Sequence, residues 1–178
     1  VDNQTIYKLK HIDEDQLLNL PFNFEEFSFF NKTKQYFLNR YGRHPIYKYK
    51  YQIILDNQET IAALLVTRIA KSSGVEITRI VDSIFFDKEK ITSENLSEIF
   101  NEYLIKNNQE YIDVICDSSE LEIYRSIGFK ENTEENFVPN KLEPLIQENS
   151  RILYATTLER DIGFHRGDSD QDRPNLII

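Results

Sequence analysis

The stretch HPIYKYKYQIIL, residues His44–Leu55, decides the fold. Its three alternate tyrosines share one side of an extended chain, and the two lysines between them share the other, which is typical of a β-strand. Two further apolar runs follow after short polar turns: TIAALLVTRIA (Thr60–Ala70) and VEITRIVDSIFF (Val75–Phe86). Three consecutive strands with short connections predict an antiparallel meander.

The chain before the meander predicts one more strand and two helices. TIYKLKHI (Thr5–Ile12) alternates loosely between apolar and polar residues and predicts a short strand. DEDQLLNL (Asp13–Leu20) begins with acids suited to a helix N-terminus, and Pro21 ends it. A second helix is predicted over Lys32–Arg40.

After the meander the period of the apolar residues changes. TSENLSEIFNEYLIKNN (Thr92–Asn108) carries apolar residues at spacings of three and four and predicts an amphipathic helix. YIDVICD (Tyr111–Asp117) predicts a buried strand, and a strand–helix–strand order favours a right-handed crossover with parallel pairing. SSELEIYRSIGF (Ser118–Phe129) predicts a helix that stops at Gly128. RILYATTL (Arg151–Leu158) is the last predicted strand.

Composition indicates one globular domain with an acidic surface. The chain has 178 residues, 40% of them hydrophobic, and a formal net charge of −9. This length is enough to bury a core, and the charge disfavours nucleic acid and anionic membranes as partners. The one cysteine, Cys116, excludes an internal disulfide and a cysteine-rich zinc site, and its apolar surroundings predict a buried thiol.

Localisation and completeness are also expectations from the sequence. No stretch reaches the roughly 20 apolar residues of a membrane helix, and the N-terminus does not resemble a signal peptide. We therefore expect no membrane partner and a cytoplasmic protein. The sequence lacks an initiator methionine, which suggests a processed chain or a fragment. In a fragment, an upstream domain of the same protein would be a candidate partner.

The order of predicted elements, together with IYRSIGF (Ile123–Phe129), resembles the GNAT family of N-acetyltransferases. In that family a similar aromatic, spacer and Gly-Phe sequence closes the fourth helix. The resemblance implies an α+β fold of three α/β/α layers around a mixed, mostly antiparallel sheet. It implies a single GNAT-like domain over residues 1–178, with an ordered C-terminal segment at 159–178.

A narrower resemblance joins five fragments of the chain: NRYGRHPIYKY, RIVD, YIDVICD, VPNKLEPLIQENSRILYA and RGDSDQDRPN. They are similar to a set of uncharacterised bacterial GNAT-like proteins. Genes for those proteins often accompany genes for surface-polysaccharide or unusual-sugar synthesis.

The GNAT resemblance implies an acyl-CoA-dependent N-acyltransferase. Its cofactor would be acetyl-CoA or another acyl-CoA, and its substrate a small amine such as an amino sugar or nucleotide sugar. Tyr124 would protonate the thiolate, Asp82 would bind the amine or act as base, and the backbone of Ile80, Val81 and Asp82 would hold the pantetheine arm. Alternatively, Tyr124 packs in the core and Asp82 caps a turn. Under strict alternation Arg79 faces away from Asp82.

One segment departs from the GNAT pattern. That family binds the CoA pyrophosphate with a glycine-rich loop at a helix N-terminus, where backbone N–H groups meet the phosphates. The corresponding stretch here, Asp82–Leu96, contains no glycine and holds several acids. Lys88, Lys90 and the helix start near Ser93 leave a weaker anion site. A catalytically inactive GNAT-like module that binds a ligand or another domain is therefore the alternative function.

The acidic tail GDSDQDRPN (Gly167–Asn175) is the last feature with a chemical signature. Together with His165 it resembles a metal site, but the later glycine and glutamate of a calcium loop are missing, and we predict no metal. Instead we expect an ordered segment in which Arg173 pairs with a distant acid such as Asp82 or Asp117. The predicted substrate-binding residues are His165, Asp170, Asp172 and Arg173.

Overall fold

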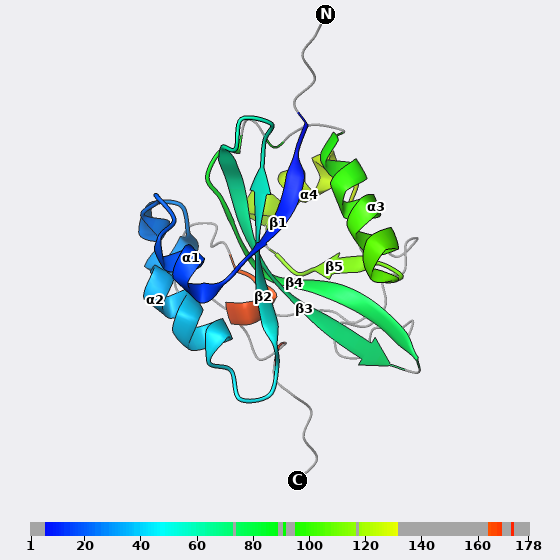
Figure 1. Ribbon diagram of the computed structural model, residues 1–178, viewed down its shortest axis with the longest axis horizontal. Coiled ribbons are helices and arrows are strands. Elements are labelled where there is room, and N and C mark those ends of the chain that lie inside the picture. Colours follow the sequence, from blue (N-terminus) through cyan, green and yellow to red (C-terminus); the bar gives the residue numbers. More distant parts are fainter. Residues whose placement is uncertain are drawn as a thin grey trace, which may run out of the picture.

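The chain folds around a mixed five-stranded sheet. The computed structural model describes residues 6–72, 74–88, 91, 95–116, 118–131, 164–168 and 172. The strands follow one another in the order β1-β2-β3-β4-β5, antiparallel up to β4 and parallel between β4 and β5 (Figure 1). Their bounds are β1 (Lys8–Ile12), β2 (Tyr49–Leu55), β3 (Ile61–Ser72), β4 (Val75–Phe85) and β5 (Ile112–Val114). The predicted meander and the predicted parallel pair are both confirmed.

Short helices cover the sheet. The N-terminal elements are α1 (Glu14–Leu18), η1 (Phe24–Glu26), η2 (Phe29–Asn31), α2 (Lys34–Phe37) and the wider π-helical turn η3 (Leu38–Gly42). The later ones are α3 (Asn95–Asn107), α4 (Ser118–Ser126) and the 3₁₀ turn η4 (Arg166–Asp168). Gly128 follows α4 with φ of 95°, the left-handed end that the sequence predicts. None of the helices in the described part of the chain combines the length and apolarity needed to cross a bilayer.

Two apolar cores lie on opposite faces of the sheet. Figure 1 shows α1 and α2 to one side of the strands, α3 to the other and α4 behind them, and residues of α3 and α4 share one core. Ile80 and Phe85 of β4 join the core under α3 and α4, whereas Val81 and Ile84 join the core under α1 and α2. The fold is therefore α+β in three layers.

A β-bulge in β4 changes which side chains share a face. Val66 lies opposite Asp82 and Thr67 lies opposite Ile80, so Val81 has no partner on β3. Such a bulge turns two consecutive residues to the same side of a sheet. Arg79 consequently lies on the same face as Asp82, contrary to strict alternation, although its Nε bonds to Asp113 (3.2 Å).

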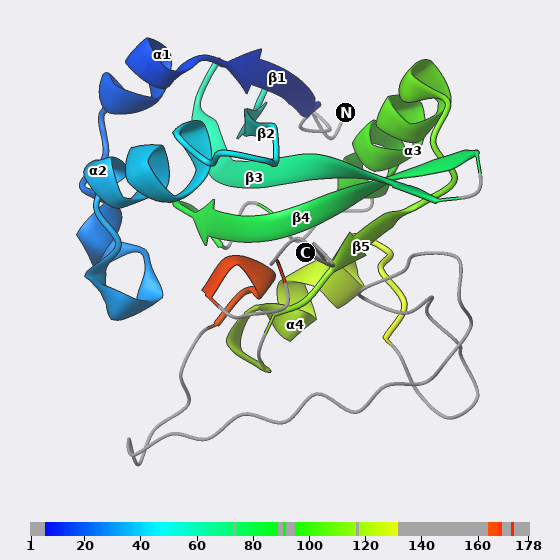
Figure 2. The ribbon, with the colours of Figure 1, turned by 90° about the horizontal axis from the view of Figure 1, so that it is seen from below.

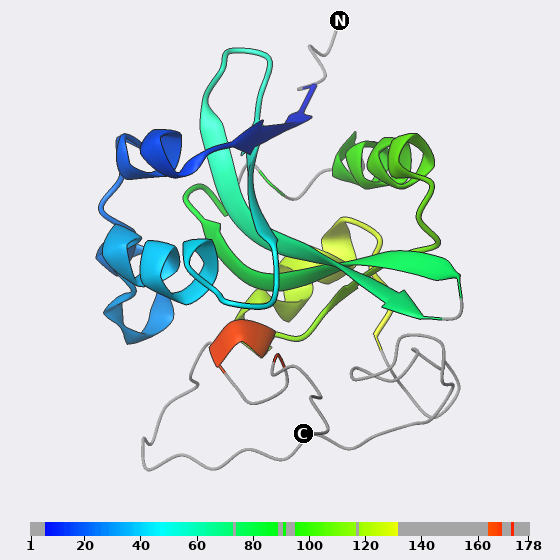
Figure 3. The same ribbon diagram turned by 60° about the horizontal axis from the view of Figure 1, so that its bottom comes forward.

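The C-terminal segment 164–168 lies where β4 and β5 part. The two strands pair only from Thr78–Ile80 to Ile112–Val114, and beyond that Arg166 N donates to Ile115 O (3.1 Å). Cys116 forms an antiparallel bridge with His165. The sequence predicts a buried thiol at Cys116, but the residue is only half-buried. In Figures 2 and 3, η4 lies between α2 and α4, beside β4. The predicted strand 151–158 lies outside the described residues.

Candidate functional site

Asp82 is the centre of a buried polar network and is completely shielded from solvent. Lys32 Nζ donates to both of its carboxylate oxygens, at 3.0 and 2.9 Å. Tyr41 Oη donates to Oδ2 (2.6 Å), and Ser83 N donates to Oδ1 (2.9 Å). The bulge in β4 and the wide turn η3 bring these groups together. The predicted Asp82 is thus a fully hydrogen-bonded, ion-paired carboxylate and not a turn cap.

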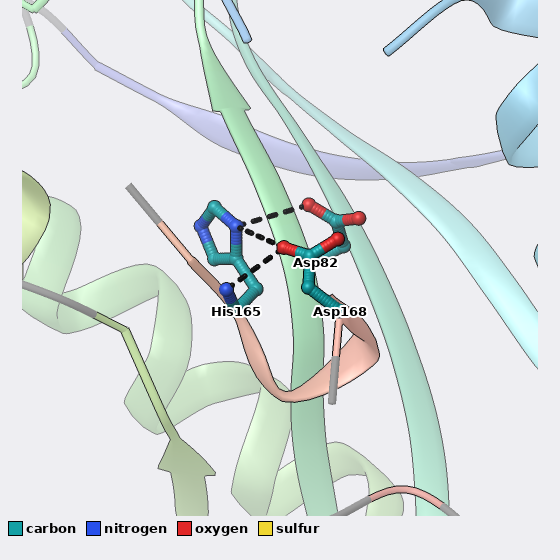
Figure 4. Close-up of side chains that lie close together, drawn as sticks. All are labelled: Asp82, His165 and Asp168. Atoms are coloured by element: carbon teal, nitrogen blue, oxygen red, sulfur yellow. Dashed lines mark hydrogen bonds and ion pairs between the residues drawn. The ribbon is translucent and has the colours of Figure 1, made fainter. Parts of the chain in front are cut away.

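His165 reaches Asp82 from the C-terminal segment. Its Nε2 lies 2.8 Å from Oε2 of Glu120 and 2.9 Å from Oγ of Ser83. Its Nδ1 forms ion pairs with Oδ1 of Asp82 (3.2 Å) and Oδ2 of Asp168 (3.8 Å), which Figure 4 marks with dashed lines. Neither contact has the geometry of a hydrogen bond, so this buried nitrogen makes none. Burial disfavours the charged ring, but the charges of Asp82 and Glu120 outweigh it and raise the pKa of His165 to about 10.

Asp168 ties the same segment to the N-terminal helices. Its Oδ2 accepts from Lys32 Nζ (2.8 Å) and from His165 N (3.0 Å), and its Oδ1 accepts from Tyr36 Oη (3.1 Å). Burial alone would raise the pKa of Asp168, but the nearby ring and backbone N–H of His165 and the charge of Lys32 hold it well below its usual range. Burial and the charge of Asp168 raise the pKa of Tyr36 to about 12.

Tyr124, the predicted catalytic acid, is buried and contacts the side chain of Ser83, whose backbone N–H bonds to Asp82. Its hydroxyl donates to Ser83 Oγ (2.9 Å), and its ring packs edge-on against Phe85 and Phe129. Burial and the charge of Glu120 raise the pKa of Tyr124 well above its usual value. The two predicted catalytic residues therefore belong to one network but do not touch. Ser83 and Glu120 join them, and neither was predicted from the sequence, because single polar residues in a strand and a helix carry no motif.

Asp172, which the sequence predicts to bind substrate, pairs with a buried arginine. Its Oδ1 accepts from Arg68 Nε (2.7 Å), and its Oδ2 accepts from the hydroxyl of Tyr49. The Arg68 guanidinium also lies 4.1 Å from the centre of the Tyr47 ring. Of the other predicted residues, Ile80 and Val81 are buried and Lys88 is exposed, while Ser93, Asp170 and Arg173 lie outside the described residues.

A cavity of about 470 Å³ opens next to this network on the α2 side. At its rim, Phe30 and Asn31 both have left-handed backbones, with φ of 61° and 50°. Such conformations are unfavourable for residues with side chains and cluster at ligand sites. Arg40 donates through Nε to Gly167 O (3.2 Å), and its two terminal nitrogens have no hydrogen-bond partner among the described residues. The lining residues are Phe30, Asn31, Lys32, Thr33, Tyr36, Arg40, Gly167 and Asp168.

Comparison with known proteins leaves the family open. The sequence matches no protein-family model and, at a significant level, no curated protein. Among solved structures it is similar to TTHA1254 from Thermus thermophilus, with 12% identity over 84% of this chain and 99% of that chain and a TM-score of 0.45. An isoleucine-to-methionine mutant of TTHA1254 gives 11% identity, the same coverage and a TM-score of 0.46. Similarity at this level assigns neither a family nor an activity.

Proposed function

We propose that the chain is a GNAT-like domain that binds a small polar ligand in the cavity beside α2. The observation that supports this proposal is the position of residues 164–168. They lie against β4 beyond the end of β5, where the GNAT resemblance places the pantetheine arm of CoA. Arg166 N donates a hydrogen bond to the carbonyl oxygen of Ile115. A Cβ on Gly167 would come within 3.0 Å of Val81 O, so the segment lies close against β4. A solvent-accessible cavity lies instead next to Tyr36 and Arg40.

The cavity has the chemistry to bind a molecule with an anionic group and hydroxyl groups. The terminal nitrogens of Arg40 match a carboxylate or phosphate in a bidentate arrangement. Asp168 and Tyr36 offer an acceptor and a hydroxyl, and Phe30, which is 59% exposed, offers an apolar face. A volume of about 470 Å³ lies in the range of roughly 300–1,000 Å³ that is usual for small-molecule sites. Nucleotide sugars and amino sugars are the ligands to test first, because of the resemblance to proteins found beside sugar-synthesis genes.

A thermal-shift screen against nucleotide sugars and amino sugars tests this function. We expect at least one compound to raise the melting temperature of the wild type, because a ligand that binds only the folded state stabilises it. Arg40→Gln should lower the affinity for that compound about tenfold or more, since a hydrogen bond to a charged group contributes about 1.5–3 kcal/mol. Arg43→Gln, an exposed arginine three residues away, is the matched control. Equal affinity in the wild type and Arg40→Gln would contradict the proposal.

Acyl-CoA-dependent transfer to a small amine is the second candidate function. It is favoured by the convergence of Tyr124 and Asp82 on Ser83 and His165 at one end of β4. It requires residues 164–168 to leave the space beside Val81. Isothermal titration with acetyl-CoA tests it directly, and Tyr124→Phe should lower turnover without unfolding the chain. Absence of heat at millimolar acetyl-CoA would exclude ordinary use of this cofactor and leave the ligand-binding function standing.

A further inference from the structure

Three side chains from two distant segments offer ligand atoms to a common point. They are Oδ1 of Asp82 on β4, Nδ1 of His165 and Oδ2 of Asp168 on η4, and all three atoms lie within 4.8 Å of one another (Figure 4). The nitrogen lies 3.2 Å from the Asp82 oxygen and 3.8 Å from the Asp168 oxygen. Ligands about 2.0–2.2 Å from a first-row cation lie roughly 3–3.5 Å apart, so this spacing fits an ion after small adjustments.

The histidine has the hydrogen-bonding pattern of a metal ligand. Nε2 of His165 lies 2.8 Å from the Glu120 carboxylate, which keeps a proton on that nitrogen and makes Nδ1 the nitrogen that can exchange its proton for an ion. Nδ1 is buried and makes no hydrogen bond, although it lies 3.2 Å from a carboxylate oxygen. A buried polar atom without a hydrogen bond is rare and needs an explanation. An ion between Nδ1 and the carboxylates supplies one.

The carboxylate oxygens outside the cluster are held by tyrosines. Tyr41 Oη donates to Oδ2 of Asp82, and Tyr36 Oη donates to Oδ1 of Asp168. Each aspartate thus has one oxygen fixed by a phenol and the other turned toward His165. Hydrogen bonds of this kind orient metal ligands from behind.

Lys32 is the internal competitor for the site. Its ammonium lies 2.8 Å from Asp168 Oδ2 and 2.9–3.0 Å from both oxygens of Asp82. The Lys32 ammonium and the protonated His165 ring stand against three carboxylates, those of Asp82, Asp168 and Glu120, so a negative charge remains and attracts a cation. Lys32 also lines the cavity of about 470 Å³ with Asp168. The cavity gives an ion access to the carboxylates and gives the ammonium room to move away.

We propose that Asp82, His165 and Asp168 bind a divalent first-row transition-metal ion, with Zn²⁺ as the preferred ion. Imidazole nitrogen suits Zn²⁺ better than Mg²⁺ or Ca²⁺, and the two carboxylate oxygens complete three protein ligands. Water or a ligand in the cavity takes the remaining position. The ion replaces a proton on Nδ1, so binding releases protons. This site does not depend on the proposed function.

Metal titration of the full chain, after removal of bound metal with a chelator, tests the site. We expect Zn²⁺ to bind with a stoichiometry of one per chain, to raise the melting temperature and to release protons into a weak buffer. Co²⁺ should give visible absorption bands from a site with a nitrogen ligand. A double variant, His11→Ala with His44→Ala, removes the two other histidines and should bind equally well. His165→Ala should lose the stoichiometric site.

Lys32→Met separates a metal site from a purely ionic network. If the ammonium competes with the ion, this variant binds Zn²⁺ about tenfold more tightly than the wild type, while its metal-free form melts at a lower temperature. Should His165→Ala fail to fold, the test rests on the Zn²⁺ stoichiometry and affinity of the wild type and of Lys32→Met. No stoichiometric Zn²⁺ or Co²⁺ binding by the wild type and by folded Lys32→Met would overturn the proposal, as would full binding by folded His165→Ala.

Discussion

Buried charged residues, and not a sequence motif, make up the candidate site. Asp82 could be predicted from the sequence because an aspartate at the end of an apolar strand is conspicuous. Lys32 could not, because a lysine before a helix is normally exposed. It is 3% exposed here, and Asp82 and Asp168 raise its pKa against the effect of burial. The partners of such a lysine are set by the folded chain, and no local pattern predicts them.

The ion pair between Asp172 and Arg68 gives a prediction at the scale of one residue. Asp172→Asn should lower the free energy of unfolding by about 3 kcal/mol, because it leaves the buried Arg68 guanidinium without its counter-charge. Glu59→Gln is the control, since Glu59 pairs with Lys8 on the exposed surface, where water and salt screen the pair, and should leave stability almost unchanged. Urea denaturation measures both. Equal stabilities of wild type and Asp172→Asn would mean that Asp172 is not packed against Arg68.

At the scale of elements, the sequence predicts those helices and strands whose apolar residues recur at a regular local spacing. The meander, the amphipathic α3 and the stop at Gly128 follow from alternation, spacing and the properties of glycine. The bulge at Val81 does not, since VEITRIVDSIFF contains no glycine or proline that would mark its position. That bulge turns Asp82 to the face of the sheet that carries Lys32 and Tyr41. Strict alternation, which ignores the bulge, assigns Asp82 to the opposite face from Arg79, and these partners could not be predicted from it. The helix predicted over 32–40 is a single α-turn continued by a π-helical turn, which places Tyr41 against Asp82.

The position of η4 against β4 depends on a residue without a side chain. A Cβ on Gly167 would lie 2.0 Å from Tyr41 Oη and 3.0 Å from Val81 O. Tyr41 is buried and held by Asp82, so the clash cannot be relieved by a simple rotation. Gly167→Ala should lower the free energy of unfolding by about 3 kcal/mol, through forced displacement of the segment.

Gly42→Ala is the matched control for this change. The nearest atom to its added Cβ is Oε1 of Glu14, at 2.6 Å, which belongs to an exposed and flexible side chain. We expect a cost below about 1 kcal/mol. Calorimetry compares the two variants, and hydrogen exchange at the Arg166 amide reports whether its bond to Ile115 survives. Equal costs in both variants would contradict the close packing of η4 on Tyr41.

At the scale of the whole molecule, the polar network joins parts of the chain that are far apart in sequence. Lys32 and Asp168 are separated by 136 residues, and Arg68 and Asp172 by 104. The acidic tail GDSDQD has the composition of a solvated segment, so the sequence allowed both an ordered and a solvated tail. Its two described aspartates, Asp168 and Asp172, are held by basic and phenolic side chains of the N-terminal half. Those partners become neighbours only once β2, β3 and β4 have formed the sheet.

Shortening the chain to end at residue 163 tests this dependence. The truncation removes His165, Arg166, Asp168 and Asp172, which leaves Arg68 without a counter-charge and Asp113 with one arginine fewer. Loss of about 4 kcal/mol should lower the melting temperature by roughly 10 °C. Backbone amides of β5 should exchange faster, since the bond to Ile115 O is lost.

Titration of the same truncated chain with acetyl-CoA shows whether the space beside Val81, once vacated, accepts the cofactor. A melting temperature equal to that of the full chain would mean that residues 164–168 do not pack on β4.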